Sequence, residues 1–178
     1  MSNTCDTIIH FRGDDALIAD LFSKLHAGMT HKELADLFDV SSEDDFRANI
    51  TDIESAENTI YQSDAWMPHV SLWDAIIEKH YKNNISYVYR AEEPSDNIYI
   101  NTDTTGITFP EKYVIDYNIN GKCDVMYFSS DDELINWCNT ELGFNQTSVS
   151  GIQNEANAML DEPDREDDRF TLGIFTKE

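Results

Sequence analysis

The side chains best suited to covalent chemistry are three cysteines, Cys5, Cys123 and Cys138. A thiol becomes a nucleophile when a neighbouring base or positive charge stabilises its thiolate. Cys138 falls on the apolar face of an expected helix, where a thiol is usually a core residue. The five histidines lie at positions 10, 26, 31, 69 and 80, and none of them completes a sequence pattern that marks an activated cysteine. The sequence therefore predicts no catalytic residue and no enzyme.

Metal-binding patterns are incomplete. Residues 101–106 and 116–121 each match the first half of a calcium-binding EF-hand loop, but Lys112 and Tyr127 stand where the loop needs a glutamate. Neither a CxxC pair nor two histidines one helical turn apart points to zinc. A glycine-rich phosphate loop is absent as well. We expect turns at both acidic stretches, with no metal and no cofactor.

The strongest chemical signal is negative charge. Twelve Lys and Arg stand against 35 Asp and Glu, giving a formal charge of −23. Duplex DNA carries one charge per roughly 1.7 Å, and rows of carboxylates on a folded surface can present a comparable field to a basic groove. Two dense clusters are the predicted partner-binding residues: Glu43, Asp44, Asp45, Asp161, Glu162, Asp164, Glu166, Asp167 and Asp168. A third cluster, residues 131–133, is explained by capping of a helix N-terminus.

This charge narrows the classes of partner. A chain at −23 is repelled by nucleic acid and by anionic membrane surfaces, so a basic protein is the expected partner. The N-terminus lacks a signal peptide, and no stretch approaches the roughly 18 apolar residues of a membrane span. An odd number of cysteines without CxxC spacing indicates reduced thiols. We expect a cytoplasmic protein.

The first half of the chain alternates between strand and helix patterns. Residues 7–12 form a strand pattern that Gly13 ends, and a helix with its apolar face at positions 17–25 follows. Thr30 and Glu33 form a capping box for a shorter helix. Residues 41–58 are polar and acidic, and we expect a turn or short helix followed by a loop. Residues 59–63 favour a strand.

The central stretch 65–92 organises the rest of the chain. Pro68 suits the first position of a helix, and the alternation over 85–90 favours a strand. Residues 97–102 give a further strand. Asn120-Gly121 predicts a two-residue hairpin turn that pairs Ile115 with Met126 and Tyr113 with Phe128. A helix beginning at a second capping box, 130–133, a weaker helix over 152–160 and a strand over 170–176 complete the chain.

This order of elements indicates an α+β fold in which helices cover one face of a mainly antiparallel sheet. The best single prediction is a ferredoxin-like βαββαβ core with an added β-hairpin. We expect residues 1–145 to form this domain with insertions. Residues 146–178 would add a C-terminal helix, an acidic loop and a closing strand packed on the same domain.

Two stretches also resemble a known family. The opening CDTIIHFRGDDALIADLF and the central DAWMPHVSLWDAIIEKHYKNNISYVYRAEE are similar to YubB-type ferredoxin-like domain proteins of plasmids and phages, and the hairpin with the helix ending in LINWC resembles the end of that module. The resemblance covers roughly residues 5–140. It implies a ferredoxin-like fold and a mobile-element origin. It implies no catalytic residue.

The leading hypothesis is a non-enzymatic acidic protein of a phage or other mobile element. It would inhibit a host nucleic-acid-binding protein, such as a defence nuclease targeted by an anti-CRISPR protein, by presenting a DNA-mimicking surface. One alternative is an accessory domain that contacts a protein through exposed aromatics such as Trp66 and Tyr89. A second is a small-molecule enzyme with a carboxylate of raised pKa beside His69 or His80. Acidity kept for solubility alone, and a homodimer through the edge of strand 97–102, also stay open.

Overall fold

The computed structural model describes residues 4–41, 47–82, 84–162, 165 and 167–177. The chain forms two compact units. The first unit comprises Met1–Thr104 with Lys177–Glu178, and the second comprises Thr105–Thr176. The position 145/146, at which the expected ferredoxin-like domain ended and its C-terminal additions began, falls inside the second unit.

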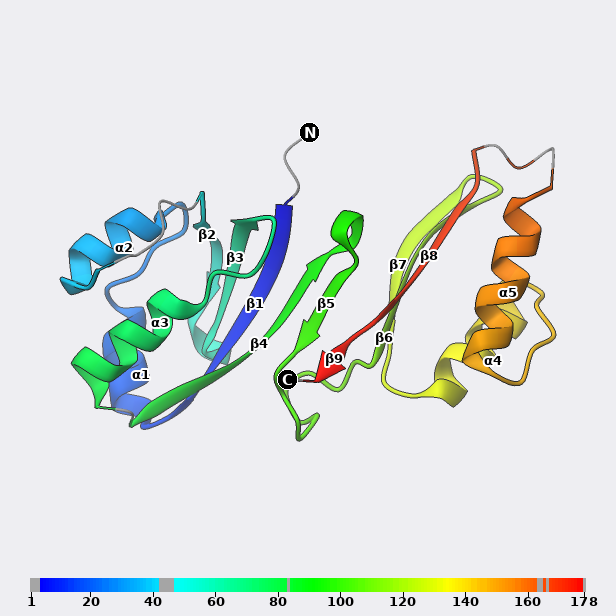
Figure 1. Ribbon diagram of the computed structural model, residues 1–178. Helices are drawn as coiled ribbons and strands as arrows, with labels where there is room; N and C mark the ends of the chain where they lie inside the picture. The colour runs from blue at the N-terminus through cyan, green and yellow to red at the C-terminus, as the bar shows by residue number, and fades with distance from the viewer. Residues whose placement is uncertain (1–3, 42–46, 83, 163–164, 166, 178) are drawn as a thin grey trace. The chain divides into compact units, whose positions relative to one another are not determined.

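The first unit is built on a sheet of six strands in the order β2-β3-β1-β4-β5-β9. The strands are β1 (Thr4–Gly13), β2 (Asn49–Glu54), β3 (Thr59–Ala65), β4 (Ile85–Glu93), β5 (Ile98–Asn101) and β9 (Thr176–Lys177). The pairs β1–β3, β1–β4, β2–β3 and β4–β5 are antiparallel (Figure 1). β5 lies between β4 and β9, so the strand predicted over 97–102 is not the free sheet edge that the homodimer hypothesis required.

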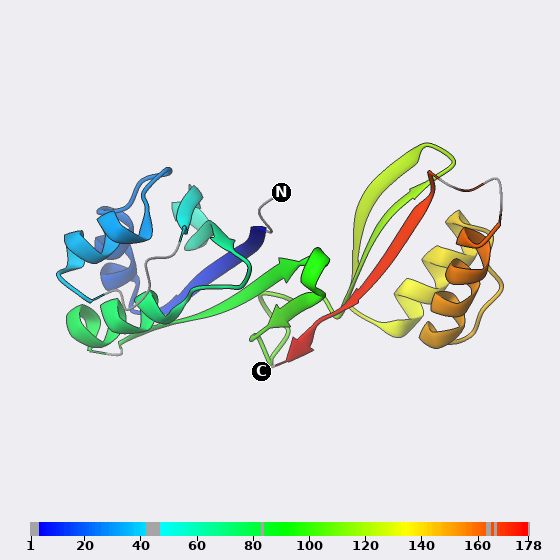
Figure 2. The same cartoon turned by 45° about the horizontal axis from the view of Figure 1, so that its top comes forward.

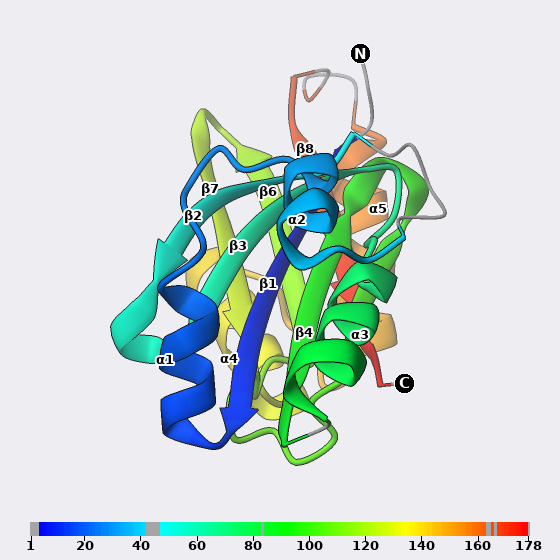
Figure 3. The ribbon, with the colours of Figure 1, turned by 90° about the vertical axis from the view of Figure 1, so that its left-hand side faces the viewer.

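The helices described in this unit cover one face of the sheet (Figure 3). They are α1 (Asp15–Phe22), α2 (His31–Phe38) and α3 (Ser71–Ile76), and α3 continues into the π-helical turn η2 (Ile77–Tyr81). Short 3-10 turns, η1 (Ser55–Glu57) and η3 (Pro94–Asp96), follow β2 and β4. Large apolar side chains of the helices and the central strands fill the core between the two layers: Ile9, Phe11, Leu21, Leu34, Ile60, Trp73 and Ile76.

The helix starts follow the capping signals of the sequence. The Asp14 carboxylate accepts hydrogen bonds from the backbone N–H groups of Ala16 and Leu17. Thr30 and Glu33 form the predicted capping box, with each side chain satisfying the other's backbone N–H. Both contacts satisfy amides that the first helical turn leaves without a partner.

The helix predicted to open at Pro68 begins instead at Ser71. Its backbone explains the later start, because the His69 carbonyl accepts a bond from the Gln62 side chain and the His69 N–H bonds to Asp64. The His69 carbonyl therefore accepts from a side chain of β3 and not from a first helical turn, while Asp64 satisfies an amide that a helix start would leave without a partner in any case.

A second difference lies within residues 41–58, where the sequence favoured a loop. Residues 49–54 form β2, which pairs with β3 through an irregularity between Ile50 and Asp52. Ile50 alone in this strand is fully buried, so the strand lacks the alternation that would reveal it in the sequence.

The second unit combines a three-stranded sheet with two helices. β6 (Tyr113–Ile119) lies between β7 (Lys122–Phe128) and β8 (Arg169–Ile174), and both pairs are antiparallel. The helices α4 (Asp131–Glu141) and α5 (Val149–Leu160) lie side by side on one face of the sheet (Figure 2). Their separate core contains Ile115, Phe128, Leu134, Cys138, Ile152 and Phe170.

The hairpin in this unit is the prediction met most closely. Ile115 pairs with Met126 and Tyr113 with Phe128, and both turn residues, Asn120 and Gly121, have positive φ. The N-cap of α4 differs slightly from the expected capping box, because the Glu133 carboxylate accepts from the Ser129 N–H. The α+β class with a mainly antiparallel sheet is confirmed.

Candidate functional site

The segment that joins β3 to α3 holds two large apolar side chains in solvent. Trp66 is 54% exposed and Met67 is 53% exposed. Trp66 adopts a φ of +68°, which is rare for a bulky residue and costs on the order of 1–3 kcal/mol. The Met67 N–H donates to the Ala65 carbonyl at 2.9 Å, so a tight three-residue turn centres on Trp66.

A buried polar network lies under this turn. Gln62 donates from Nε2 to both carboxylate oxygens of Asp64, at 2.8 and 2.9 Å, and accepts at Oε1 from the Trp73 indole N–H at 3.0 Å. The Thr7 hydroxyl donates to Asp64 at 3.1 Å. The network thus connects β1, β3 and α3, and its bonds to His69 fix the end of the turn.

The turn is held from the other side by its own histidine. The His69 ring donates from Nε2 to the Ala65 carbonyl at 3.2 Å, so this carbonyl accepts from both ends of the turn. Buried polar groups cost free energy unless they are hydrogen-bonded. Much of the hydrogen bonding of this buried cluster therefore stabilises the conformation of the Trp66 turn.

His31, the first residue of α2, approaches the same network. It is 4% exposed, and its Nε2 atom has no hydrogen-bond partner among the residues that the structure describes. Burial lowers the pKa of His31, while Gln62 and Asp64 oppose that shift. Burial also raises the pKa of the Asp64 carboxyl. The pKa shifts of Asp64 and His31 thus both favour the neutral form of the side chain.

The structure brings a carboxyl of raised pKa close to His69, as the enzyme alternative required. Asp64 and Gln62 are nevertheless buried, and their polar atoms bond to the protein itself. An acid–base pair must reach a substrate to act on it. The arrangement is better suited to holding the Trp66 turn than to proton transfer.

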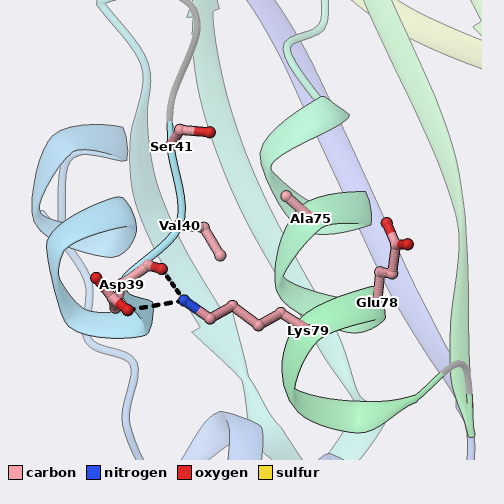
Figure 4. Close-up of a pocket in the computed structure, with 6 residues that line it drawn as sticks. All are labelled: Asp39, Val40, Ser41, Ala75, Glu78 and Lys79. Carbon is pink, nitrogen blue, oxygen red and sulfur yellow. Dashed lines mark hydrogen bonds and ion pairs between the residues drawn. The ribbon is translucent and has the colours of Figure 1, made fainter.

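A shallow groove of about 580 Å³ lies elsewhere on the first unit, between the end of α2 and the α3–η2 helix (Figure 4). Lys79 crosses it to bond the Asp39 carboxylate at 2.8 Å and the Asp39 carbonyl, while Glu78 turns away from this pair. His80 donates to the Phe38 carbonyl at 2.5 Å. Both side chains satisfy carbonyls that the end of α2 leaves without a partner. The residues of the groove therefore connect α2 to the α3–η2 helix.

The predicted acidic residues have different environments. Glu43, Asp44, Asp45, Asp164 and Glu166 lie outside the described residues. Asp161, Glu162 and Asp167 are exposed. Asp168 is tied into the fold, since it pairs with Arg165 at 2.9 Å and accepts from the Asn120 N–H at 2.9 Å. These bonds lower its pKa, the ion pair with Arg165 most of all.

The two aromatics that were expected to be exposed differ in the structure. Trp66 is exposed, whereas Tyr89 is half-buried and packs against the core of the first unit beside Tyr87. Its strand pattern was read correctly, but Tyr89 points to the face that the helices cover. Gln62 and Asp64 were not predicted as site residues, and His31 was considered only as a possible partner of a cysteine, because an isolated polar residue in a strand or at a helix start forms no motif.

Cys138 is buried in the core of the second unit, as its place on the apolar helix face predicted. Burial raises the pKa of Cys5 and of Cys138 to about 12, so both thiols are protonated near neutral pH. Cys123 is exposed on β7. Among the residues that the structure describes, no group of three or more His, Cys, Asp or Glu could hold a metal ion.

Comparison with known proteins gives no match to a family model, to a curated protein or to a solved structure. The resemblance to YubB-type proteins therefore stays a prediction. None of the described helices has both the length and the apolar character that crossing a membrane would require.

Proposed function

We propose that this protein is a non-enzymatic acidic binding protein that competes with nucleic acid for the basic groove of a partner protein. The observation that carries the proposal is that most of its basic side chains are already paired with carboxylates. At least seven of the twelve Lys and Arg side chains form ion pairs with carboxylates: Arg12, Lys24, Lys79, Arg90, Lys112, Arg165 and Arg169. The surplus carboxylates therefore meet few positive charges on the surface.

The surplus is spread over both units. The first unit has 8 basic and 21 acidic side chains, a formal charge of −13, and the second has 4 basic and 14 acidic, a formal charge of −10. Charge of one sign on a folded surface steers a partner of opposite sign and suppresses wrong partners. A basic nucleic-acid-binding protein, including a host defence nuclease, is the partner that fits.

The fold supports the family part of the proposal. Strands β2-β3-β1-β4 are antiparallel neighbours, with helices between β1 and β2 and between β3 and β4. This is the order expected of a ferredoxin-like βαββαβ core, to which β5 and β9 would be additions. A YubB-type relationship and an origin in a phage or other mobile element are proposed on the same ground.

The experiment is capture of basic proteins on the immobilised chain from a nuclease-treated bacterial lysate, followed by elution with 20-bp duplex DNA, with oligo-dT or with salt. We expect a nucleic-acid-binding protein that nucleic acid displaces and whose affinity falls steeply with salt. The double variant Asp161→Asn/Asp167→Asn should weaken retention. Asp132→Asn/Glu141→Gln, which removes equal charge from α4, is the matched control for the position of that charge. Retention that neither nucleic acid nor salt affects would contradict the proposal.

A further inference from the structure

The Trp66 turn has a large exposed surface on a rigid support. Trp66 and Met67 are adjacent, and both are more than half exposed. Scattered exposed apolar residues are ordinary, but an exposed tryptophan at positive φ combines two features that are each unfavourable for an isolated protein. Tryptophan is also among the residues that most often dominate binding energy at interfaces.

The turn is preorganised for contact. Ala65 accepts hydrogen bonds from Met67 and His69, and Gln62 and Asp64 fix the backbone of His69 from below. A segment whose backbone is already ordered loses less conformational entropy on binding. The hydrogen bonds of the turn therefore compensate for the strain at Trp66 and keep its indole ring outside the core.

Acidic residues also lie at the end of the sheet from which the turn leaves. Ala65 lies opposite Thr4 at the start of β1, and two residues further on Asp6 lies opposite Ser63 and Glu92. Asp96 closes the 3-10 turn that follows β4 at the same end. Trp66 thus follows a strand whose end is shared with Asp6 and Asp96, on a unit whose formal charge is −13.

We infer that Trp66 takes the place of a nucleobase in a base-stacking pocket of a single-stranded nucleic-acid-binding protein, an inference that rests on the proposed function. Grooves for single strands combine positive charge along the backbone with aromatic side chains on which bases stack. In duplex DNA the base faces are hidden within the stack. A duplex-binding groove therefore does not need a pocket in which a base, or a projecting indole, could stack. The combination of ring and carboxylates therefore selects the single-strand class.

Two purified probes test this assignment. One is an OB-fold single-stranded-DNA-binding protein loaded with fluorescein-labelled 20-nucleotide oligo-dT, and the other is a sequence-independent duplex-binding protein loaded with a labelled 20-bp duplex. Fluorescence anisotropy measures displacement of each nucleic acid by the full chain. The variants are Trp66→Ala and the control Leu37→Ala, which truncates another exposed apolar residue, on α2.

We expect the wild-type chain to displace oligo-dT at lower concentration than duplex. Trp66→Ala should require about tenfold more protein on the single-strand probe, the size of one lost stacking contact, and Leu37→Ala should match the wild type. Equal potency of Trp66→Ala and the wild type, or displacement of the duplex alone, overturns the inference and leaves the proposed function in place. Displacement of neither nucleic acid contradicts the proposed function itself.

Discussion

At the scale of single residues, Trp66 carries a cost that the isolated protein does not need. Replacement by glycine removes the clash of a Cβ atom at φ +68° and adds only glycine's own entropy cost of about 0.5–1 kcal/mol. Because strain of this kind costs about 1–3 kcal/mol, Trp66→Gly should raise the free energy of unfolding by about 1 kcal/mol. Urea denaturation measures this change.

Met67→Gly is the control for the Trp66 prediction. Met67 is equally exposed but lies outside the positive-φ region, so glycine there should lower stability slightly. A Trp66→Gly protein less stable than the wild type would show that the indole ring contributes more than its backbone conformation costs.

His31 gives a pH dependence of known sign. Its pKa in the folded state is lowered by burial, below the ordinary value of 6.5 that the unfolded chain retains. The unfolded state therefore binds the proton more readily, and the stability contributed by this site falls as pH drops through about 6.5. Relative to His31→Gln, the wild type should lose stability between pH 7.5 and 5.5, by at most about 1.4 kcal/mol per pH unit.

Asp64 acts in the opposite direction, because a raised folded-state pKa favours the folded state as pH falls. The double variant His31→Gln/Asp64→Asn, compared with Asp64→Asn alone, therefore tests His31 without this opposing group. Chemical denaturation at a series of pH values would show parallel curves for wild type and His31→Gln if burial of His31 had no effect.

At the scale of elements, the junction of β1 with α1 depends on a glycine. Gly13 has a φ of +131°, and a Cβ atom there would lie 2.4 Å from the Asn84 carbonyl oxygen and 2.9 Å from the Ile85 Cα. Both neighbours are backbone atoms that cannot rotate away. Gly13→Ala should therefore destabilise the protein by more than about 2 kcal/mol.

Gly28 is the matched control for this prediction. It also has positive φ, at +86°, but an added Cβ would meet nothing within 4 Å. Gly28→Ala should cost only the conformational penalty of about 1 kcal/mol. Thermal or urea unfolding of the two variants separates steric overlap from φ strain, and equal costs would contradict the close approach at Asn84.

The elements that the sequence predicted well are those specified by local interactions. The hairpin at Asn120-Gly121 and the capping box at Thr30 depend on residues at most four apart, and both formed as expected. The start of α3 and the strand β2 depend on side chains of β3 that are distant from the local pattern, namely Gln62, Asp64 and the partners of Ile50. The site was predictable at Trp66, whose exposure was expected, but its buried support was not.

At the scale of the whole molecule, the two units have separate cores. Ile76 lies in the first core and Leu134 in the second, and both are fully buried. Truncation of either to alanine should destabilise its own unit by about 2–5 kcal/mol. Hydrogen-exchange mass spectrometry should show faster exchange for Ile76→Ala in peptides of the first unit only, and for Leu134→Ala in peptides within 105–176.

Faster exchange in both units for each variant would contradict independent cores. It would indicate that the chain unfolds as one cooperative system. The matched pair makes this outcome recognisable, since each variant is the control for the other.

The return of the chain to its first sheet has a consequence during protein synthesis. Strands β1 to β5 leave the ribosome before the whole of the second unit, and β9 beside β5 comes only afterwards. At translation rates of about 5–20 residues per second, the outer edge of β5 waits roughly 4–15 seconds for its final neighbour. An unpaired strand edge is a template for pairing with other chains. The nascent protein thus passes through an interval in which a chaperone that covers sheet edges would improve its yield.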